Sequence, residues 1–417
     1  MRDKPRSAQR ADARDEPRRS AEGAKAGSWY SLPKGVWILG GVSLLNDTAT
    51  ESVYPLLPFF LTTVLGATPV SLGVIEGAAE AVASILKVIS GTVSDRWNRR
   101  KPIVVAGYGL SAAARPFISL ATGWIVVFVL RLIDRVGKGV RGAPRDAMLA
   151  ELADRTNRGR VYGFHQAMDH IGAILGPLLA TVFLMAYPSR YRTLFALTAI
   201  PGALTVLLLK WAKEQKTVVG SRESGFGIRG ASKLPSPLVR YLIVLSIFTL
   251  GNSSDAFLLL RLTDAAGGPR FIPLLWAALH VVKTVSSVIG GSASDRLGRR
   301  TLIAGGWLVY ALVYAGFALS ASLAALIFWF MVYGMYYGAV EGAERALVAD
   351  FARPMQKGTA FGVYNGVAGI GALISSVVFG LLWKIFGAAV AFASGAALAT
   401  LAAMLLFALV PAPTREV

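Results

Sequence analysis

Apolar residues dominate the chain in twelve runs of about 20 residues or more, separated by short polar segments. About 20 residues of α-helix cross a hydrocarbon core of ~30 Å, so each run is long enough to span a membrane. The runs predict transmembrane helices over 34–61, 70–93, 102–122, 124–148, 159–186, 191–211, 238–261, 271–293, 301–321, 324–349, 358–385 and 387–410. The pattern therefore predicts an all-α, polytopic membrane protein.

The composition agrees with this fold class and excludes others. Hydrophobic residues make up 54% of the 417 residues and charged residues 16%, whereas a soluble domain carries about 25% charge. This balance excludes a soluble enzyme, a coiled coil and a disordered chain. A β-barrel is excluded because its strands would alternate in segments of about ten residues. The chain contains no cysteine, which removes disulfides, iron–sulfur clusters and thiolate metal sites.

Polar segments divide the twelve runs into two groups of six. The segment between runs six and seven is rich in Ser, Gly and basic residues, which indicates a linker. We expect an N-terminal bundle over 34–211, the linker over 212–237 and a C-terminal bundle over 238–410. The ends, 1–33 and 411–417, are expected to be tails. The N-terminal tail has the composition of a disordered segment, and no apolar h-region marks it as a signal peptide.

The net charge of +19 is large enough to raise the question of nucleic-acid binding. Most of it lies in short loops between spans, where the positive-inside rule explains it, so no nucleic-acid partner is expected. Basic residues crowd the linker and the loops after spans two, four and eight, whereas the opposite loops hold only Arg190, Arg192 and Arg270. This bias predicts that both termini and the linker are cytoplasmic.

The two halves resemble each other at an offset near 200 residues, which indicates an internal repeat. Residues 91–100 (GTVSDRWNRR) align with residues 291–300 (GSASDRLGRR). Arg145, near the end of span four, aligns with Arg345 in span ten. At an offset of 199, an acid and a base seven residues apart also repeat; the two pairs are Glu151 with Arg158 and Asp350 with Lys357.

Twelve spans, a six-plus-six repeat and the loop motif G-x3-D-R-x-[GN]-R-R resemble the major facilitator superfamily of secondary transporters. The resemblance covers roughly 34–410, and its only departure in the loop motif is Asn98 for Gly, which tolerates a left-handed turn. It implies two six-helix bundles around a central cavity, with spans 3, 6, 9 and 12 outside. The distribution of charged residues agrees with this layout, since spans 6, 9 and 12 have almost no charged residue in their interiors. Arg115 in span three is the exception, because it is a charge inside a span that is expected to lie outside.

Two partial motifs extend the resemblance. Four residues of span five match the family's antiporter signature: Gly163, Gly172, Gly176 and Pro177. Ala180 and Thr181 replace the Gly-Gly pair that usually closes it. In span four, Arg135-x2-Lys138-Gly139 resembles the proton-linked motif R-x2-Q-G, with Lys for Gln. Together the two motifs resemble those of drug:proton antiporters.

Asp47 and Glu51 lie near the middle of span one, four residues apart and therefore on one helix face. Two carboxylates in a poorly solvated place can bind and release a proton as water access changes. They are our first candidates for proton coupling, together with Asp134 and Arg135 in span four. The alternative is that these groups are permanently paired and only hold helices together.

Further polar residues inside the spans are candidates for the wall of a substrate cavity. They are Asn46, Glu80, Arg115, Arg131, Lys138, His165, Gln166, Asp169, Asn252, Asp255, His280, Lys283, Glu341, Tyr364 and Asn365. Neutralisation of span four by the acids of span two, and pairing of core polar groups, are the structural alternatives. The histidines show no compact metal-ligand spacing, so no metal site is expected.

The repeated charges and glycines are candidates for a cytoplasmic gate. Residues that repeat in both halves should have the same geometric role in each half, as the parts of a shared gate do. Residues that bind a substrate need not repeat, because a substrate need not be symmetric. They are Gly91, Asp95, Arg96, Arg99, Arg100, Arg145, Glu151, Arg158, Gly291, Asp295, Arg296, Arg299, Arg300, Arg345, Asp350 and Lys357.

Motifs for nucleotide binding and hydrolysis, such as G-x4-G-K-[ST], H-E-x-x-H and G-x-S-x-G, do not occur. We therefore expect a monomeric, non-enzymatic transporter of the bacterial inner membrane, without a cofactor, that exports a small organic solute and is driven by the proton gradient. Symport of an anionic solute or metal chelate is the first alternative, favoured by the basic stripe of span four. A scaffold or sensor that transports nothing is the second.

Overall fold

The computed structural model describes residues 32–97, 99–153, 158–212, 234–353 and 357–412, and all regular structure in these residues is helical. Most of the expected tails and of the linker lies outside the described residues. The helices of the first half are α2 (Lys34–Val53), η2 (Tyr54–Leu56), α3 (Leu57–Phe59), η3 (Phe60–Val64), α4 (Pro69–Trp97), α5 (Arg100–Phe117), η4 (Ile118–Leu120), α6 (Trp124–Glu151), α7 (Arg158–Ala186), α8 (Tyr191–Leu197) and α9 (Ala199–Leu209). Those of the second half are α10 (Ser236–Gly251), α11 (Asp255–Ala266), α12 (Ile272–Leu297), α13 (Arg299–Leu319), α14 (Leu323–Phe351), α15 (Lys357–Phe386) and α16 (Ala388–Leu409).

The twelve predicted spans agree with these helices to within a few residues at most ends, and the main difference lies in span seven. That span is broken at residues 252–254 into α10 and α11, and its second part continues to Ala266. The run Asn252-Ser253-Ser254 explains the break, since such side chains compete with the helix for backbone hydrogen bonds. Ser254 caps α11 by accepting a hydrogen bond from the Ala256 amide at 3.2 Å.

Eight of the described helical segments are long and apolar enough to cross a membrane. They are Arg100–Leu120, Arg160–Ala186, Tyr191–Leu209, Ser236–Ala266, Arg299–Leu319, Leu323–Phe351, Thr359–Phe386 and Ala388–Leu409. The segments built on α2, α4, α6 and α12 are not among them; on α12 the described apolar stretch, Ile272–Ser287, is shorter. Large apolar side chains such as Val182, Leu312 and Ile385 are 60% exposed or more, as expected for surfaces that face lipid.

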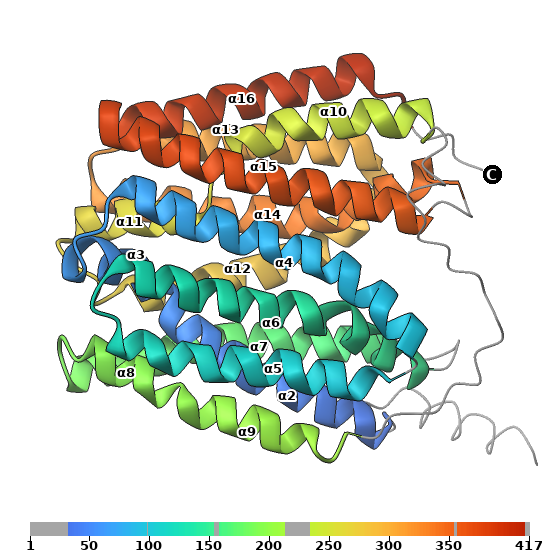
Figure 1. Ribbon diagram of the computed structural model, residues 1–417. Coiled ribbons are helices and arrows are strands. Elements are labelled where there is room, and N and C mark those ends of the chain that lie inside the picture. Colours follow the sequence, from blue (N-terminus) through green and yellow to red (C-terminus); the bar gives the residue numbers. More distant parts are fainter. Residues whose placement is uncertain (1–31, 98, 154–157, 213–233, 354–356, 413–417) are drawn as a thin grey trace, which may run out of the picture.

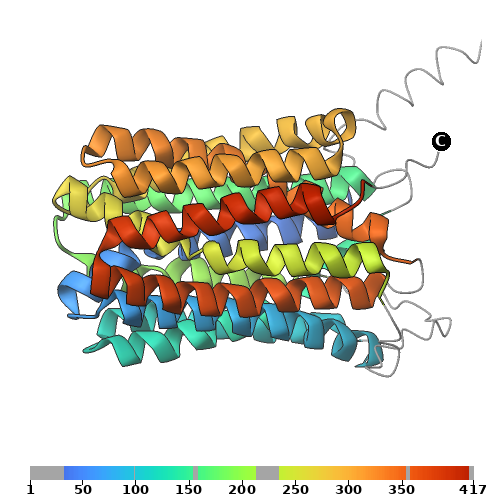
Figure 2. The ribbon, with the colours of Figure 1, turned by 90° about the horizontal axis from the view of Figure 1, so that it is seen from above.

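The helices form two groups, α2 to α9 and α10 to α16, which lie mostly in the lower and upper parts of Figure 1 and overlap in its middle at α4 and α12. All of them run roughly along one direction, as Figure 2 also shows. The groups meet mainly where α4 packs against α15 and α7 against α12. The outermost positions in Figure 1 belong to α8 and α9 below and to α16 above. The charge-poor spans six and twelve therefore lie farthest from the contact between the groups.

Glycines bring α4 and α15 almost into backbone contact. A Cβ atom added at Gly73 would lie 2.1 Å from the Ser376 carbonyl oxygen, and one at Gly380 would lie 2.5 Å from the Pro69 oxygen. Small residues matter here because lipid tails are as apolar as leucine, so membrane helices associate largely through close van der Waals packing.

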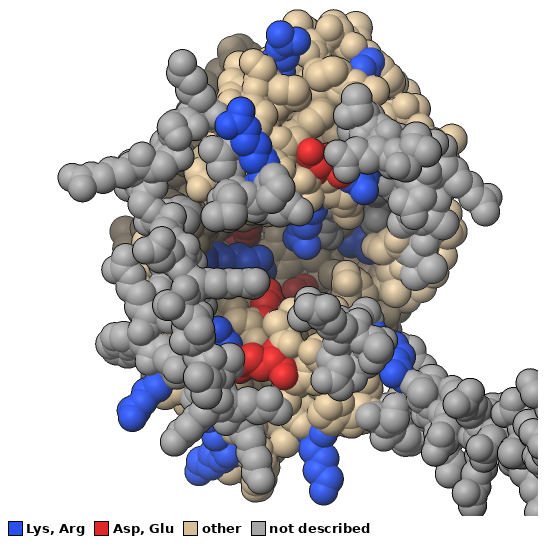
Figure 3. All heavy atoms as spheres, turned by 90° about the vertical axis from the view of Figure 1, so that its right-hand side faces the viewer, with Lys and Arg blue, Asp and Glu red and all other residues tan. Residues whose placement is uncertain are grey.

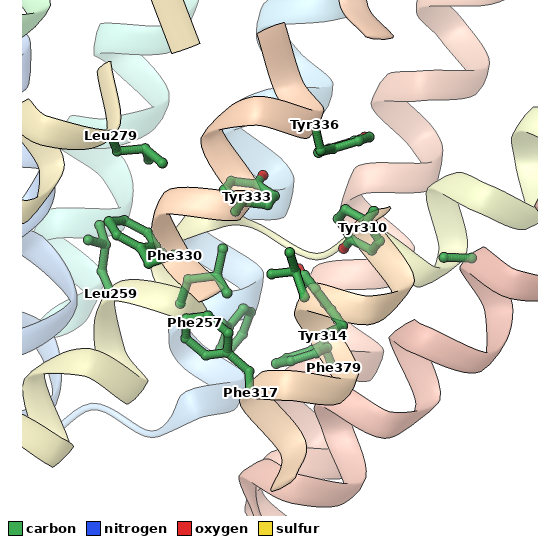
Figure 4. Close-up of a cluster of buried hydrophobic side chains, with 14 of the residues drawn as sticks. Phe257, Leu259, Leu279, Tyr310, Tyr314, Phe317, Phe330, Tyr333, Tyr336 and Phe379 are labelled. Atoms are coloured by element: carbon green, nitrogen blue, oxygen red, sulfur yellow. The ribbon is translucent and has the colours of Figure 1, made fainter. Parts of the chain in front are cut away.

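An aromatic core fills the second half. Tyr310 stacks on Tyr314 with ring centroids 4.2 Å apart, and Phe248 stacks on Trp307 at 4.4 Å. Figure 4 shows Tyr333, Tyr336, Tyr310 and Tyr314 as neighbours within this cluster. These rings are buried and fix α13 and α14 against α10.

Replacing Gly73 by Ala should force α4 away from α15, because the new methyl group would meet a backbone oxygen that cannot rotate aside. We expect a loss of about 1–3 kcal/mol in stability, measured as a lower unfolding temperature of the detergent-purified protein. Gly305→Ala is the matched control, since a Cβ atom there meets nothing within 4 Å. Equal unfolding temperatures for the two variants would contradict the close contact.

Candidate functional site

A hollow opens between the two groups of helices at the end of the molecule where α2 begins and α16 ends. Figure 3 looks into this end and shows both basic and acidic side chains on the walls of the hollow. A cavity of about 270 Å³ lies there, and its lining includes Glu80, Asn252, Tyr337, Glu344, Tyr364 and Asn365. At the opposite end the groups meet, because α11 packs against α3 and α12 packs against η2. Among the described residues, the halves are thus in contact at one end and separated by the hollow at the other.

Arg131 on α6 makes a buried ion pair with Glu76 on α4. Its Nη2 donates to both carboxylate oxygens at 2.7 and 2.9 Å, and its Nε donates to Oε1 at 3.1 Å. Both residues are at most 6% exposed. Glu76 of span two thus neutralises Arg131 of span four, which is the structural alternative to a role in substrate binding.

Arg115 on α5 continues the same network. Its Nε donates to Asp134 Oδ1 at 3.0 Å, and its Nη2 donates to the side-chain oxygen of Asn46 on α2 at 2.9 Å. Asp134 also lies 3.7 Å from Arg131. The exceptional charge in span three is therefore explained, because the side chain reaches inward and links α5 to α6 and α2.

Asp47 and Glu51 lie on α2, where it borders α7 and α12. The Asn46 amide donates to Asp47 Oδ1 at 2.8 Å. Glu51 accepts a hydrogen bond from the indole nitrogen of Trp276 at 2.8 Å, and His280 Nε2 lies 4.0 Å from the same oxygen. Trp276 and His280 belong to the other half of the molecule. The carboxylate of Glu51 therefore takes part directly in a contact between the halves.

The antiporter-like glycines place α7 against this part of α2. A Cβ atom at Gly172 would lie 2.6 Å from the Leu44 oxygen and 3.1 Å from Asp47 Cβ, and one at Gly176 would lie 2.4 Å from the Thr48 oxygen. Gly163, in contrast, has open space around it. Pro177 stands inside α7, and its carbonyl oxygen accepts from the Thr181 hydroxyl at 2.9 Å. The motif acts here as a packing surface for the helix that carries both carboxylates.

Three more cations follow along α6. Arg141 donates to Ser111 Oγ at 2.7 Å and stacks over the Tyr108 ring at 4.4 Å. Arg135 is 8% exposed and Lys138 is exposed. Within the described residues, neither Arg135 nor Lys138 has a hydrogen-bond or ion-pair partner. Glu80 on α4, which lines the cavity, likewise has no hydrogen-bond or ion-pair partner among the described residues.

The second half places Asp255 opposite Lys283. The Lys283 ammonium lies 3.3 Å from Asp255 Oδ2, and the Tyr333 hydroxyl donates to Oδ1 at 2.5 Å. Aromatic rings surround the ammonium, with the Tyr337 ring centroid at 4.1 Å and that of Trp276 at 5.2 Å.

Some predicted residues have other surroundings. His165 and Asp169 face each other along α7 with Nδ1 3.5 Å from Oδ2, and Gln166 is exposed beside them. Asn365 lines the cavity while its amide donates to the Phe361 oxygen at 2.8 Å. Tyr364 donates to Glu344 at 3.0 Å.

Sequence analysis did not place Trp276 among the site residues. Trp276 stands four residues before His280 on the same helix, so its position on the polar face of span eight was visible in the sequence. Glu344 accepts from Trp307 Nε1 at 3.0 Å, a contact between two helices that helical periodicity does not indicate.

The candidate gate residues that are described make contacts within each half. Arg100 pairs with Glu151, and Arg299 pairs with Asp350, so the pair repeats at an offset of 199 residues. Arg300 donates to the oxygens of Val410 and Phe407, and Arg145 pairs with the adjacent Asp146 at 2.9 Å. Gly91 lies close to Ala143, Arg99 is exposed, and Arg345 lines the cavity.

Eight predicted residues lie outside the part of the chain whose side-chain surroundings the structure describes. They are Asp95, Arg96, Arg158, Gly291, Asp295, Arg296, Glu341 and Lys357. Among the described residues, no group of three or more histidine, aspartate or glutamate side chains could hold a metal ion.

Comparisons with known proteins agree with this architecture. The chain is 32% identical over 381 residues to an uncharacterised MFS-type transporter, MJ1317, of Methanocaldococcus jannaschii, and the match covers 90% of this chain and 94% of the relative. It is 26% identical over 329 residues to the multidrug resistance protein MdtH of an Enterobacter species, covering 77% and 80% of the two chains. The crystal structure of a POT family transporter in complex with 5-aminolevulinic acid superimposes with a TM-score of 0.77 at 13% identity, covering 92% and 97%.

The profile of the Major Facilitator Superfamily matches residues 39–278 and 243–417, which together include every described helix except the first turn of α2. The family expected from the loop motif and the repeat is thus confirmed. The chain belongs to the major facilitator superfamily and is a multi-pass membrane transporter, not an enzyme.

Proposed function

We propose that this transporter exports a small organic solute in exchange for protons, and that Asp47 and Glu51 carry the proton. The observation that supports this most directly is the hydrogen bond from Trp276 to Glu51, because it joins a carboxylate of one half to the other half. The multidrug resistance relatives support export. Orientation with cytoplasmic termini in a bacterial inner membrane, and a monomeric state, remain parts of the proposal.

Protonation of Glu51 would change the contact between the halves. A hydrogen bond to an ionised carboxylate is roughly twice as strong as one between neutral groups. Loss of the Glu51 charge therefore weakens the hydrogen bond from Trp276. This hydrogen bond belongs to the state described here, in which the hollow is open at the end where α2 begins and α16 ends. A group that interacts differently in two states shifts the equilibrium between them. Proton binding at Glu51 would in this way favour the state in which the opposite end opens.

The driving force is sufficient without a nucleotide. One proton that crosses a potential of ~100 mV supplies about 2.3 kcal/mol. Each unit of pH difference adds about 1.36 kcal/mol. Together they could maintain a roughly several-hundred-fold solute gradient.

Symport of an anionic solute is the second candidate function. Arg135 and Lys138 favour it, because they are cations of α6 that have no hydrogen-bond or ion-pair partner among the described residues. Two such cations would suit a carboxylate or phosphate group. The direction of flux in vesicles with an imposed pH gradient separates the two candidates, since only export runs against proton entry.

The proposal predicts that Glu51→Gln and Asp47→Asn lose uphill transport but retain exchange. The substrate is first identified with a panel of metabolites and drugs, by comparing a deletion strain with an overexpressing strain. In proteoliposomes, the accumulation ratio of the variants should fall toward one, because a neutral side chain cannot carry the proton. Exchange of labelled for unlabelled substrate without a gradient should continue.

Glu80→Gln is the matched control, since Glu80 is exposed on the cavity wall and makes no hydrogen bond or ion pair with the described residues of the other half. It should keep proton-driven accumulation even where its affinity for substrate changes. If Glu51→Gln, Asp47→Asn and the double variant all accumulate substrate normally, these carboxylates do not couple transport to protons.

We further propose that the repeated pairs Arg100–Glu151 and Arg299–Asp350 serve the gate by holding the ends of α5 and α6, and of α13 and α14, together. Both pairs are formed while the hollow is open, and each lies within one half. They would let each half move as one unit when this end closes.

Charge reversal tests this role. Arg100→Glu and Glu151→Arg should each lower the transport rate and cost roughly 1–3 kcal/mol of stability, because each leaves two like charges together in a partly buried place. The double variant restores an opposite pair and should recover much of both. Recovery of stability without recovery of rate would show that the pair is structural only.

A further inference from the structure

Lys283 has an unusual setting for a membrane lysine. Its ammonium is 4.1 Å from the ring centroid of Tyr337, 5.2 Å from that of Trp276 and 5.6 Å from that of Tyr333. The Asp255 carboxylate completes the group at 3.3 Å. Lys283 is 7% exposed. Three aromatic rings and one carboxylate thus enclose a single positive charge.

The carboxylate is held in place independently of Lys283. Asp255 is the first residue of α11, directly after the break at 252–254, where Ser254 caps the helix. Its Oδ1 accepts from the Tyr333 hydroxyl at 2.5 Å, which leaves Oδ2 directed at the ammonium. Tyr333 in turn packs among the rings of the aromatic core seen in Figure 4. The site is therefore rigid on the side of the carboxylate.

The cage borders the central cavity. Tyr337 is 40% exposed and lines the cavity together with Asn252 and Tyr336. Glu80, Glu344 and the basic Arg345 also line this cavity, so charged groups of both signs lie near the cage. A solute in the cavity would meet the exposed ring of Tyr337 first.

We propose that Asp255, Trp276, Tyr333 and Tyr337 form a binding site for the ammonium group of an organic cation, and that Lys283 occupies this site as a tethered competitor. A cation against the faces of several aromatic rings is the arrangement by which proteins recognise quaternary ammonium groups. A single cation would be enough to neutralise Asp255, so charge neutralisation alone does not explain the three aromatic rings around the ammonium. The lysine stem is long and flexible, so its ammonium can move into the hollow when a solute takes its place.

The proposed site gives the transporter of the proposed function a substrate class, organic cations. It rests on the proposed function only for the direction of transport and its source of energy. Binding is measured with purified full-length protein in detergent, where there is no gradient. Failure of cation binding would leave proton coupling standing. Normal binding together with uphill transport by the Asp47 and Glu51 variants would overturn the coupling and leave the site standing.

The test compares choline with its neutral isostere, 3,3-dimethylbutan-1-ol. Lys283→Ala removes the competitor and opens its space, so it should bind choline about tenfold or more tighter than the wild type. Lys283→Met is the matched control, because a neutral side chain of similar length still fills the cage; its affinity should not rise. The isostere should gain no affinity in either variant. Asp255→Asn in the Lys283→Ala background should abolish the gain.

A second measurement uses the wild-type protein and does not depend on the folding of a variant. Reductive methylation of Lys283, followed by peptide mass spectrometry, should become several-fold faster as choline is added, since the displaced ammonium becomes accessible. Lys138, which is already exposed, should be methylated at a constant rate. Choline affinity that is equal in wild type and Lys283→Ala, or labelling of Lys283 that does not respond to choline, would overturn the proposal.

Discussion

A charge in the middle of a membrane helix is stable only when other helices satisfy it, at a cost of about 2.5–3.5 kcal/mol per unsatisfied residue on insertion scales. The first half meets this constraint with one connected network. It runs from Glu76 on α4 through Arg131 and Asp134 on α6 to Arg115 on α5 and Asn46 on α2. Because each link needs the next, none of these four helices can move alone without exposing a charge to lipid. The network therefore favours motion of the half as one body.

Close helix packing complements this network where the chain has no charges to pair. Gly172 and Gly176 bring α7 onto the backbone of α2, and Gly73 and Gly380 do the same for α4 and α15. Helices that touch through small residues gain dispersion energy without interlocking large side chains. The α2–α7 contact lies within the first half and next to Asp47, so the antiporter-like glycines set where this carboxylate stands. The α4–α15 contact joins the halves, and a smooth surface there suits two bodies that change their relative tilt.

The sequence predicted most of the fold because span length and charge content are local properties. The helix boundaries and the inward position of the charged spans follow from them, whereas the family was expected from the loop motif and the internal repeat. Partners across helices were not predictable, since helical spacing gives the face of a residue but not the helix that it meets. Arg115 seemed misplaced until its contacts with Asp134 and Asn46 were known. Trp276 was overlooked because an indole in an apolar run resembles ordinary core packing until its nitrogen is seen to donate to Glu51.

The difference between the halves is informative because the chain is a repeat. The Arg100–Glu151 and Arg299–Asp350 pairs recur at an offset of 199, as expected for a feature of the shared scaffold. The chemistry in the middle of the membrane does not recur. Glu76 and Asp134 of the first half pair with guanidinium groups. In the second half Asp255 pairs with Lys283 and also accepts from the Tyr333 hydroxyl. Neutral donors orient a carboxylate without cancelling its charge, so Tyr333 would still hold Asp255 in place if Lys283 moved away. The proposed cation site therefore lies where the two halves differ, as expected for a feature that serves the solute rather than the shared scaffold.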